Sequence, residues 1–371
     1  MFHYHVNGQY FFNPIRAFVY AAYNCPHDHV TFDLIDPCFQ FIDWTCYPTE
    51  SYESLYRQRA QQIRNKYDKI ILAVSGGTDS SAMVRAFFNN NIHVDAIYIG
   101  YYGHSNYDKE FFGTPGKVIQ WIKSTWPEQS KHIEIHLIDL INFVDSKYQQ
   151  SDWVLDQRHT SHFRLTTGVI PEDISDFLNE KYPSSRWALV AGLEKPSITS
   201  DGNYAYFVDK TFVHVINRTN IEYFYLNPDM PSIVVKHAHD LARSIRNGFT
   251  EYYQLKRAIG QTGDVADVRS KREKEIIETA NSILSKLNFA HLKKSADLLA
   301  DTKNNCMVST IDTFLKQKKS SVNSWMHGLA SIQSDRKLID YMLRHGYLSS
   351  PSQTIQSYNG LLTKKYHLGL Q

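Results

Sequence analysis

Four short apolar runs, separated by segments with helical periodicity, constrain the fold of this 371-residue chain more than any other feature. The runs have the character of buried strands, and they span residues Lys69–Val74, Val94–Ile99, Ile133–Ile138 and Trp187–Ala191. The helical patterns between them span Ser80–Asn90, Thr114–Trp126 and Glu172–Lys181. This alternation predicts an α/β fold, in which right-handed crossovers build a parallel sheet with helices on both faces.

The segments that flank this core differ from it in character. Asn7-Gly8 is a hairpin turn signal, because both residues tolerate positive φ, and residues 31–44 resemble two short strands broken by a proline. An arginine-rich helix is predicted at residues 52–67. Further helical patterns occur around residues 237–247, 271–287 and 290–299. We therefore predict an N-terminal β-rich region with a leading helix (1–67), an α/β core (68–202) and a helical C-terminal region (203–371).

Composition limits the partners and the compartment. Lys and Arg number 40 and Asp and Glu number 38, so the charge balance does not indicate a nucleic-acid or membrane partner. The four cysteines form no C-x-x-C pair, which argues against zinc ribbons and suits a reducing cytosol. The N-terminus does not resemble a signal peptide, and no uncharged apolar run has the length of a membrane span. We expect a cytoplasmic protein without membrane contact.

The loop after the first strand reads SGGTDS and consists of Ser75, Gly76, Gly77, Thr78, Asp79 and Ser80. The two glycines lack a Cβ, so an oxyanion can approach the main-chain N–H groups closely. The following helix directs its N-terminus at the same space, where free N–H donors and the helix dipole favour phosphate. Asp79 would repel phosphate unless a cation lies between them, and Mg²⁺ takes carboxylate and phosphate oxygens together. The loop therefore predicts a site for a magnesium-bound phosphate chain.

Two common phosphate loops do not fit this segment. A Walker loop requires G-x-x-x-x-G-K-[ST], and the nearest string, GTPGKV, lacks both the spacing and the hydroxyl. A dinucleotide fingerprint requires G-x-G-x-x-G after the first strand, which Gly76-Gly77 does not provide. An ordinary glycine-rich turn is the alternative, but the full string between an apolar strand and a helix favours a binding loop.

The string SGGTDS after a β-strand resembles the PP-loop of the N-type ATP pyrophosphatases, a superfamily that includes asparagine synthetase, GMP synthetase and NAD synthetase. The resemblance covers residues 68–199 and is closest to the asparagine-synthetase-like branch, in which an arginine-rich helix also precedes this strand. It implies an adenine nucleotide alpha hydrolase-like fold that uses ATP and Mg²⁺. It also implies adenylation of a carboxylate or carbonyl oxygen with loss of pyrophosphate, after which a nitrogen or sulfur nucleophile displaces AMP.

A second stretch, ALVAGLEKPSIT, follows the fourth strand. The resemblance implies that Gly192 turns the backbone here, that Glu194 completes the metal site with Asp79, and that Lys195 neutralises charge on the α-phosphate. The catalytic candidates are therefore Asp79, Glu194 and Lys195. A surface loop with an incidental ion pair is the alternative interpretation of this stretch.

Adenine recognition is expected on main-chain groups near Ile99 and Gly100 and on Leu72 and Ala73, where the side chains need only be apolar. Asp139 is a further candidate acid at the end of the third strand, although a solvated turn residue is the simpler interpretation. The basic loop at residues 157–164 would bind an anionic substrate or be solvated.

His237 and His239 diverge on a helix, which disfavours a metal pair.

We expect no glutaminase domain, because only some seventy residues precede the loop and Phe2, not cysteine, follows Met1. We expect a small-molecule acceptor, with ammonia or an amine supplied free or by a separate amidotransferase partner. Three alternatives remain open: a PP-loop enzyme that modifies nucleobases in tRNA or DNA, a non-catalytic ATP-binding interaction protein, and the related sulfate-reductase fold, whose C-terminal cysteine motif is not evident.

Overall fold

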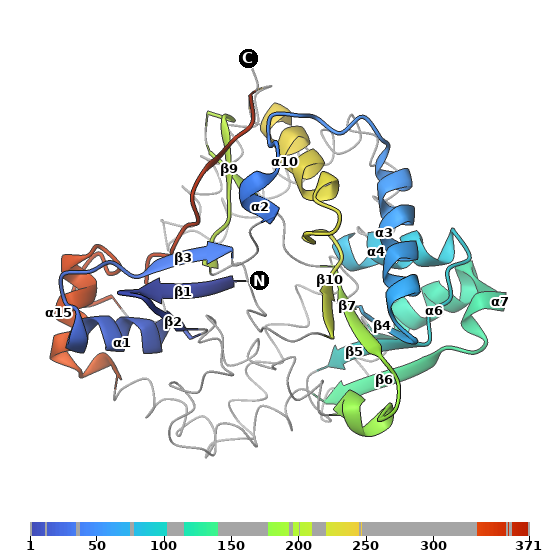
Figure 1. The fold of residues 1–371 in the computed structure, drawn as a ribbon. Helices are drawn as coiled ribbons and strands as arrows, with labels where there is room; N and C mark the ends of the chain where they lie inside the picture. Colours follow the sequence, from blue (N-terminus) through green and yellow to red (C-terminus); the bar gives the residue numbers. More distant parts are fainter. Residues whose placement is uncertain are drawn as a thin grey trace, which may run out of the picture.

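The computed structural model describes residues 2–11, 13–34, 38–74, 78–101, 115–139, 177–192, 196–199, 201–209, 220–244, 246, 332–353, 355 and 358–369. Within these ranges, the chain forms one five-stranded parallel sheet and two three-stranded antiparallel sheets (Figure 1). The chain is therefore an α/β protein with a small antiparallel sheet at its N-terminus.

The parallel sheet contains the four predicted strands and one further strand. Its members are β4 (Lys69–Ala73), β5 (Ala96–Tyr101), β6 (Glu134–Asp139), β7 (Trp187–Ala191) and β10 (Ile221–Tyr223). Their order across the sheet is β10-β7-β4-β5-β6. The chain thus moves outward from β4 through β5 to β6 and returns to the other side of β4 for β7. This reversal places the topological switch point between β4 and β7, where ligands of such sheets bind at the carboxyl ends.

The fifth strand, β10, lies outside the range 68–202 that the sequence predicts for the core. The region after residue 203 is therefore not helical throughout. It also supplies β9 (Tyr204–Tyr206) and β11 (Tyr366–His367), which form an antiparallel sheet with β8 (Ser197–Ile198). Helix α10 (Ser232–Ser244) confirms a helical pattern close to the predicted position, whereas the patterns at 271–287 and 290–299 lie outside the described residues.

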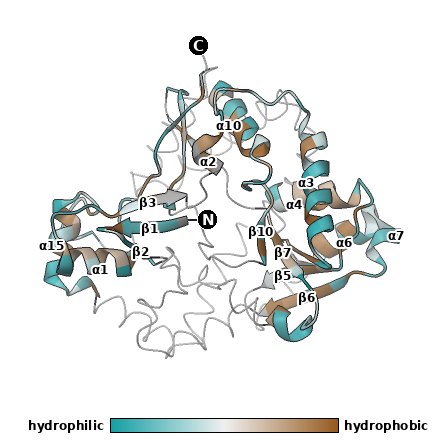
Figure 2. Cartoon of the chain, viewed as in Figure 1, coloured by the Kyte–Doolittle hydropathy of each residue, from teal (hydrophilic) through white to brown (hydrophobic). Residues whose placement is uncertain are grey.

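Helices cover one face of the parallel sheet, and those nearest to it are α3 (Tyr52–Lys66), α4 (Thr78–Phe88) and α6 (Pro115–Thr125). Ile70 and Leu72 pack in the core beneath them, whereas Ile71 faces the opposite side and joins a different cluster. On that side, a helical turn at residues 177–181 meets the sheet, where the Trp187 indole donates to Asn179 Oδ1 at 3.1 Å. Strands buried on both faces explain the continuous apolar runs (Figure 2).

A small antiparallel sheet opens the chain, in the order β2-β1-β3, from β1 (Phe2–Val6), β2 (Gln9–Phe11) and β3 (Thr31–Leu34). The predicted hairpin turn is confirmed, because Asn7 and Gly8 have φ of 46° and 76°. The prediction of a second strand after residue 37 is wrong, since residues 38–41 form helix α2 (Cys38–Phe41). A proline immediately before a segment suits the start of a helix as well as the end of a strand.

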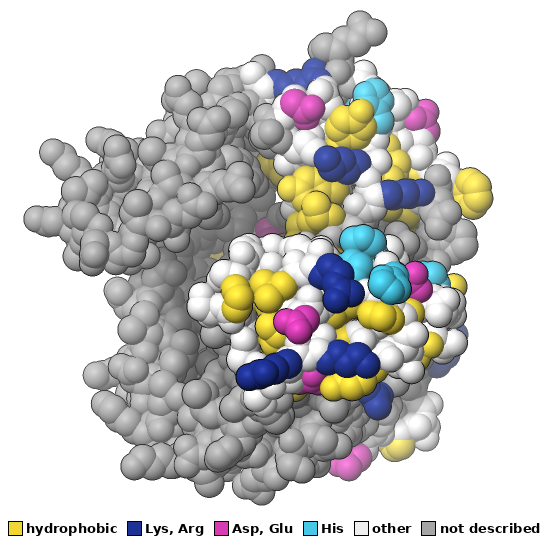
Figure 3. Space-filling view, turned by 90° about the vertical axis from the view of Figure 1, so that its left-hand side faces the viewer, with side chains coloured by type: hydrophobic (Ala, Val, Ile, Leu, Met, Phe, Trp, Pro, Cys, Tyr) yellow, Lys and Arg dark blue, Asp and Glu magenta, His cyan; other side chains and the backbone are white. Residues whose placement is uncertain are grey.

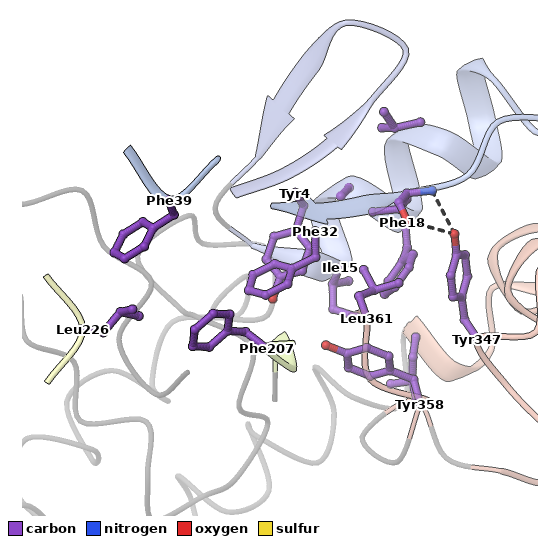
Figure 4. Close-up of a cluster of buried hydrophobic side chains, with 14 of the residues drawn as sticks. Tyr4, Ile15, Phe18, Phe32, Phe39, Phe207, Leu226, Tyr347, Tyr358 and Leu361 are labelled. Atoms are coloured by element: carbon purple, nitrogen blue, oxygen red, sulfur yellow. Dashed lines mark hydrogen bonds between the residues drawn. The ribbon is translucent and has the colours of Figure 1, made fainter. Parts of the chain in front are cut away.

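Both ends of the chain share one core (Figure 4). Helix α15 (Arg336–Arg344) packs against α1 (Pro14–Asn24), and the Tyr347 hydroxyl bridges the main chain of Val30. The buried Asp209 carboxylate accepts hydrogen bonds from the hydroxyls of Tyr4 and Tyr358. We call this assembly of β1–β3, α1, α15 and the Asp209 contacts the terminal unit.

The surface of the terminal unit carries both signs of charge. Figure 3 views the molecule from the side of α1 and α15, and it shows Lys and Arg interspersed with Asp, Glu and His. No helix among the described residues is both long and apolar enough to cross a bilayer.

Candidate functional site

The described part of the SGGTDS segment lies at the carboxyl edge of the parallel sheet. Ala73, the last residue of β4, pairs with Ala191, the last residue of β7, and with Tyr98 of β5, so β4 and β7 end level with each other while β5 continues to Tyr101. The motif leaves β4 at this edge, next to the switch point. Ser75, Gly76 and Gly77 themselves lie outside the described residues, as do Glu194 and Lys195, so their roles stay predictions.

Helix α4 begins at Thr78, directly after the motif glycines. Its first turn therefore stands at the carboxyl edge of the sheet, and it contains Asp79, which is half-buried, and Ser80, which is buried. The first N–H groups of a helix have no partner within the helix, and the helix dipole adds positive potential there. The helix start predicted from the sequence is thus confirmed to within two residues, and its position suits an anionic ligand.

Gly192 lets the end of β7 approach this first turn closely. A Cβ added at Gly192 would lie 3.1 Å from the main-chain oxygen of Asp79 and 3.3 Å from Cα of Ser80. Contacts of that length are tighter than ordinary van der Waals packing, so a larger residue would push the two elements apart. The sequence predicts a turning role for Gly192, and the structure adds a packing role between β7 and α4.

Two tyrosines lie near Asp79, the buried Tyr225 and the partly buried Tyr56, and no sequence motif marks either of them. The Tyr225 hydroxyl donates to the main-chain oxygen of Asp79 at 2.6 Å. Burial, followed by the negative charge of Asp79, raises the pKa of Tyr56. Burial also raises the pKa of Tyr225, with smaller contributions from Tyr56 and Asp79. Both hydroxyls therefore stay protonated at neutral pH, and the Tyr225 hydroxyl acts as a donor.

Two tyrosines of α3, Tyr52 and Tyr56, contact side chains of α10. The Tyr56 hydroxyl lies 2.7 Å from His237 Nε2, and the Tyr52 hydroxyl donates to Asp240 Oδ2 at 2.8 Å. His239 Nε2 contacts the main-chain oxygen of Trp44 instead, at 2.8 Å. The two histidines thus diverge, as predicted. In the ranges that the structure covers, no group of three or more His, Cys, Asp or Glu side chains forms a metal site.

The arginine-rich helix α3 has a structural role next to the site. Arg59 Nη2 lies 2.6 Å from Glu222 Oε2 on β10, and Arg59 is fully buried. The same carboxylate accepts hydrogen bonds from Lys66, Tyr67 and Asn227. Burial alone would raise the pKa of Glu222, but the Arg59 charge and these hydrogen bonds outweigh it, so the pKa lies below the usual value. This network fixes β10, the strand that leads to Tyr225.

The remaining predicted positions are those expected to contact adenine, Asp139 and the basic loop. Leu72 and Ile99 are buried, and Gly100 pairs with Ile138, so these residues offer no more than main-chain groups or apolar contact at the edge. Asp139 ends β6, but its side chain is outside the described residues, as is the basic loop at 157–164.

Comparison of the chain with protein-family models, with curated proteins and with solved structures yields no match. The case for a function therefore depends on the motif, the strand order and the contacts at the edge of the sheet.

Proposed function

We propose that this chain is an ATP-dependent, AMP-forming ligase of the asparagine-synthetase-like branch of the N-type ATP pyrophosphatases, built on an adenine nucleotide alpha hydrolase-like core. One observation carries the proposal: the SGGTDS segment joins β4 to α4 at the topological switch point. A string that resembles a phosphate-binding loop therefore follows β4 at the place where α/β sheets bind ligands, which supports the proposal.

The residues present suit magnesium-bound ATP. Main-chain amides of residues 75–80 and the hydroxyls of Ser75, Thr78 and Ser80 would bind the β- and γ-phosphates. Asp79 is half-buried at the start of α4, so its carboxylate is close to the positive end of the helix and still partly open to solvent. Asp79 and Glu194 would hold Mg²⁺, which supplies positive charge to the phosphates when bound. The main-chain groups around Ala73, Ile99 and Gly100 would contact adenine.

The reaction requires the protein to position the substrates and to neutralise charge on the phosphates, and it requires no protein nucleophile. An oxygen of the acceptor attacks the α-phosphorus, the bond to the bridging oxygen breaks, and pyrophosphate leaves. Lys195 would neutralise charge on the α-phosphate during this step. Ammonia or an amine then attacks the activated carbon and AMP leaves. The nitrogen donor would act free or from a separate amidotransferase partner, and the acceptor would be a small molecule.

The product of ATP cleavage tests this proposal. The protein is incubated with Mg²⁺ and ATP labelled at the α-phosphate, together with ammonia and a library of small carboxylic acids and amides. We expect label to accumulate in AMP in step with pyrophosphate, and only with particular acceptors. Accumulation of ADP would contradict adenylation, because it requires cleavage between the β- and γ-phosphates.

A further inference from the structure

We propose that Tyr225 is a positioning residue that holds the first turn of α4 in the orientation needed to bind the phosphates of ATP. This inference rests on the proposed function, because it assigns a role within the same site. Its basis is the convergence of the Tyr225 hydroxyl and Gly192 on a single main-chain oxygen, that of Asp79, together with the packing that immobilises the Tyr225 ring.

The first part of this convergence is the path of the chain after β10. The main-chain N–H of Phe224 donates to the oxygen of Ala191 at 2.9 Å, so the chain stays paired with the end of β7 just past the last strand residue. The next residue is Tyr225, whose hydroxyl reaches the Asp79 oxygen at 2.6 Å. The edge strand of the sheet is thereby connected to the first turn of α4 across the end of β7.

The second part is the approach of Gly192, whose added Cβ would lie 3.1 Å from the same Asp79 oxygen. The Asp79–Ser80 peptide is therefore held between a hydrogen-bond donor and a close main-chain neighbour. Because a peptide is planar, fixing its oxygen also fixes the direction of the Ser80 N–H group. That group belongs to the first turn of α4, where the helix dipole favours an anion.

The third part is the immobilised ring of Tyr225, which is 1% exposed. The ring meets Tyr56 edge-on at a centroid distance of 5.4 Å and lies 5.3 Å from the ring of His237. Tyr56 and His237 are themselves 2.7 Å apart through their polar atoms. A hydroxyl on a closely packed ring holds the Asp79 main-chain oxygen in position more accurately than a hydroxyl on a mobile side chain would.

The test is the substitution Tyr225→Phe, which removes the hydroxyl and leaves the ring. Binding of Mg-ATP and of adenosine to the full chain is measured by calorimetry. We expect ATP to bind about tenfold more weakly, in line with the loss of one buried hydrogen bond, and adenosine to bind as before. If Tyr225 had only a structural role, the substitution would weaken the binding of both ligands by the same factor.

Tyr341→Phe is the matched control. The Tyr341 hydroxyl also donates to the main-chain oxygen of an aspartate, Asp28, at 2.8 Å, and Tyr341 is 2% exposed. It lies in the terminal unit, away from α4, so the control should leave the affinities for ATP and adenosine unchanged.

The outcomes separate this inference from the function on which it rests. Wild-type protein that does not bind Mg-ATP overturns both. In the other case, the wild-type protein binds Mg-ATP, but Tyr225→Phe and Tyr341→Phe have the same ratio of ATP affinity to adenosine affinity. That result overturns only the role of Tyr225. If Tyr225→Phe does not fold, Gly192→Ala replaces it, because the added Cβ displaces the same peptide. A selective loss of ATP affinity then supports the inference, and an unchanged ratio contradicts it.

Discussion

Two aspartates in this protein lie next to buried tyrosines, and they relate to those tyrosines in opposite ways. In the terminal unit, the Asp209 carboxylate itself accepts hydrogen bonds from Tyr4 and Tyr358 and from the Leu361 N–H, and the residue is completely buried. At the edge of the parallel sheet, Tyr225 donates to the main chain of Asp79, and the Asp79 side chain remains partly exposed. The first arrangement uses the carboxylate to join segments that are distant in sequence. The second holds the backbone and leaves the carboxylate at a surface.

The difference separates a structural acid from a candidate functional one. A buried carboxylate surrounded by donors contributes to stability, because each donor would lose a partner if the carboxylate were removed. A partly exposed carboxylate at a helix N-terminus contributes little to packing and is accessible to a cation. The two aspartates should therefore respond in opposite ways to substitution.

The largest effect is expected for Asp79→Asn. ATP turnover should fall at least about 100-fold, because an amide does not replace a metal-binding carboxylate, while the free energy of unfolding should change by less than about 0.5 kcal/mol. Initial rates of AMP formation and urea unfolding measure the two quantities. Unchanged turnover would contradict the metal-binding role, and a large loss of stability would make Asp79 a structural residue like Asp209.

The reverse pattern is expected for Asp209→Ala. The substitution leaves two tyrosine hydroxyls and the Leu361 N–H without their acceptor in a buried place. We expect the free energy of unfolding to fall by about 3 kcal/mol or more, with turnover per folded molecule unchanged. Urea unfolding monitored by tryptophan fluorescence gives the first value. A loss of turnover in the fully folded variant would show that the terminal unit contributes to the candidate ATP site.

A third acid, Glu222, extends the comparison because its contribution to the free energy of unfolding should depend on pH. Its pKa in the folded protein lies below the ordinary value of 4.5, so its contribution to stability is present above about pH 4.5 and is lost as the pH falls through the folded pKa. Glu222→Gln should therefore cost about 3 kcal/mol at neutral pH, because Arg59 stays buried without its counter-charge, and less in acid. Unfolding of both proteins across this pH range measures the difference. A constant difference would contradict the linkage.

The smallest effect is expected for the helix cap of α1. The Asn13 side chain accepts from the N–H groups of Ile15 and Arg16 at 2.8 and 3.2 Å. Asn13→Ala should lower the free energy of unfolding by about 1 kcal/mol and leave ATP turnover unchanged. Thermal unfolding compared with that of Asp335→Ala, which removes the equivalent cap from α15, checks whether both caps contribute alike.

Local patterns predict the parts of this fold in which local forces decide the structure. Strand β4 is a continuous apolar run, and helix α4 follows it with the spacing that the motif requires, so both are evident from sequence. Helix α1 is not among the predicted elements, although Asn13 and Pro14 form a clear start signal before a stretch with apolar residues at helical spacing. Capping residues therefore indicate this helix as directly as apolar periodicity does.

The contacts that define the site have no local signal. Strand β10 has three residues in an aromatic segment, and its pairing with β7 stabilises it, so periodicity does not identify it. The Tyr225 hydrogen bond goes to a main-chain oxygen 146 positions away, and any residue at position 79 would supply that oxygen. The close approach of Gly192 to Asp79 likewise depends on the order of strands. These features emerge only when the chain is folded.

We propose that the turn between β4 and α4 binds the triphosphate of ATP at the switch point. The most direct test is a crystal structure of the protein with Mg²⁺ and an ATP analogue that has a methylene group between the α- and β-phosphates. We expect the β- and γ-phosphates to lie against the first turn of α4, with the metal on Asp79 and the adenine toward β5. A nucleotide bound elsewhere, or no nucleotide at saturating concentration, would contradict it.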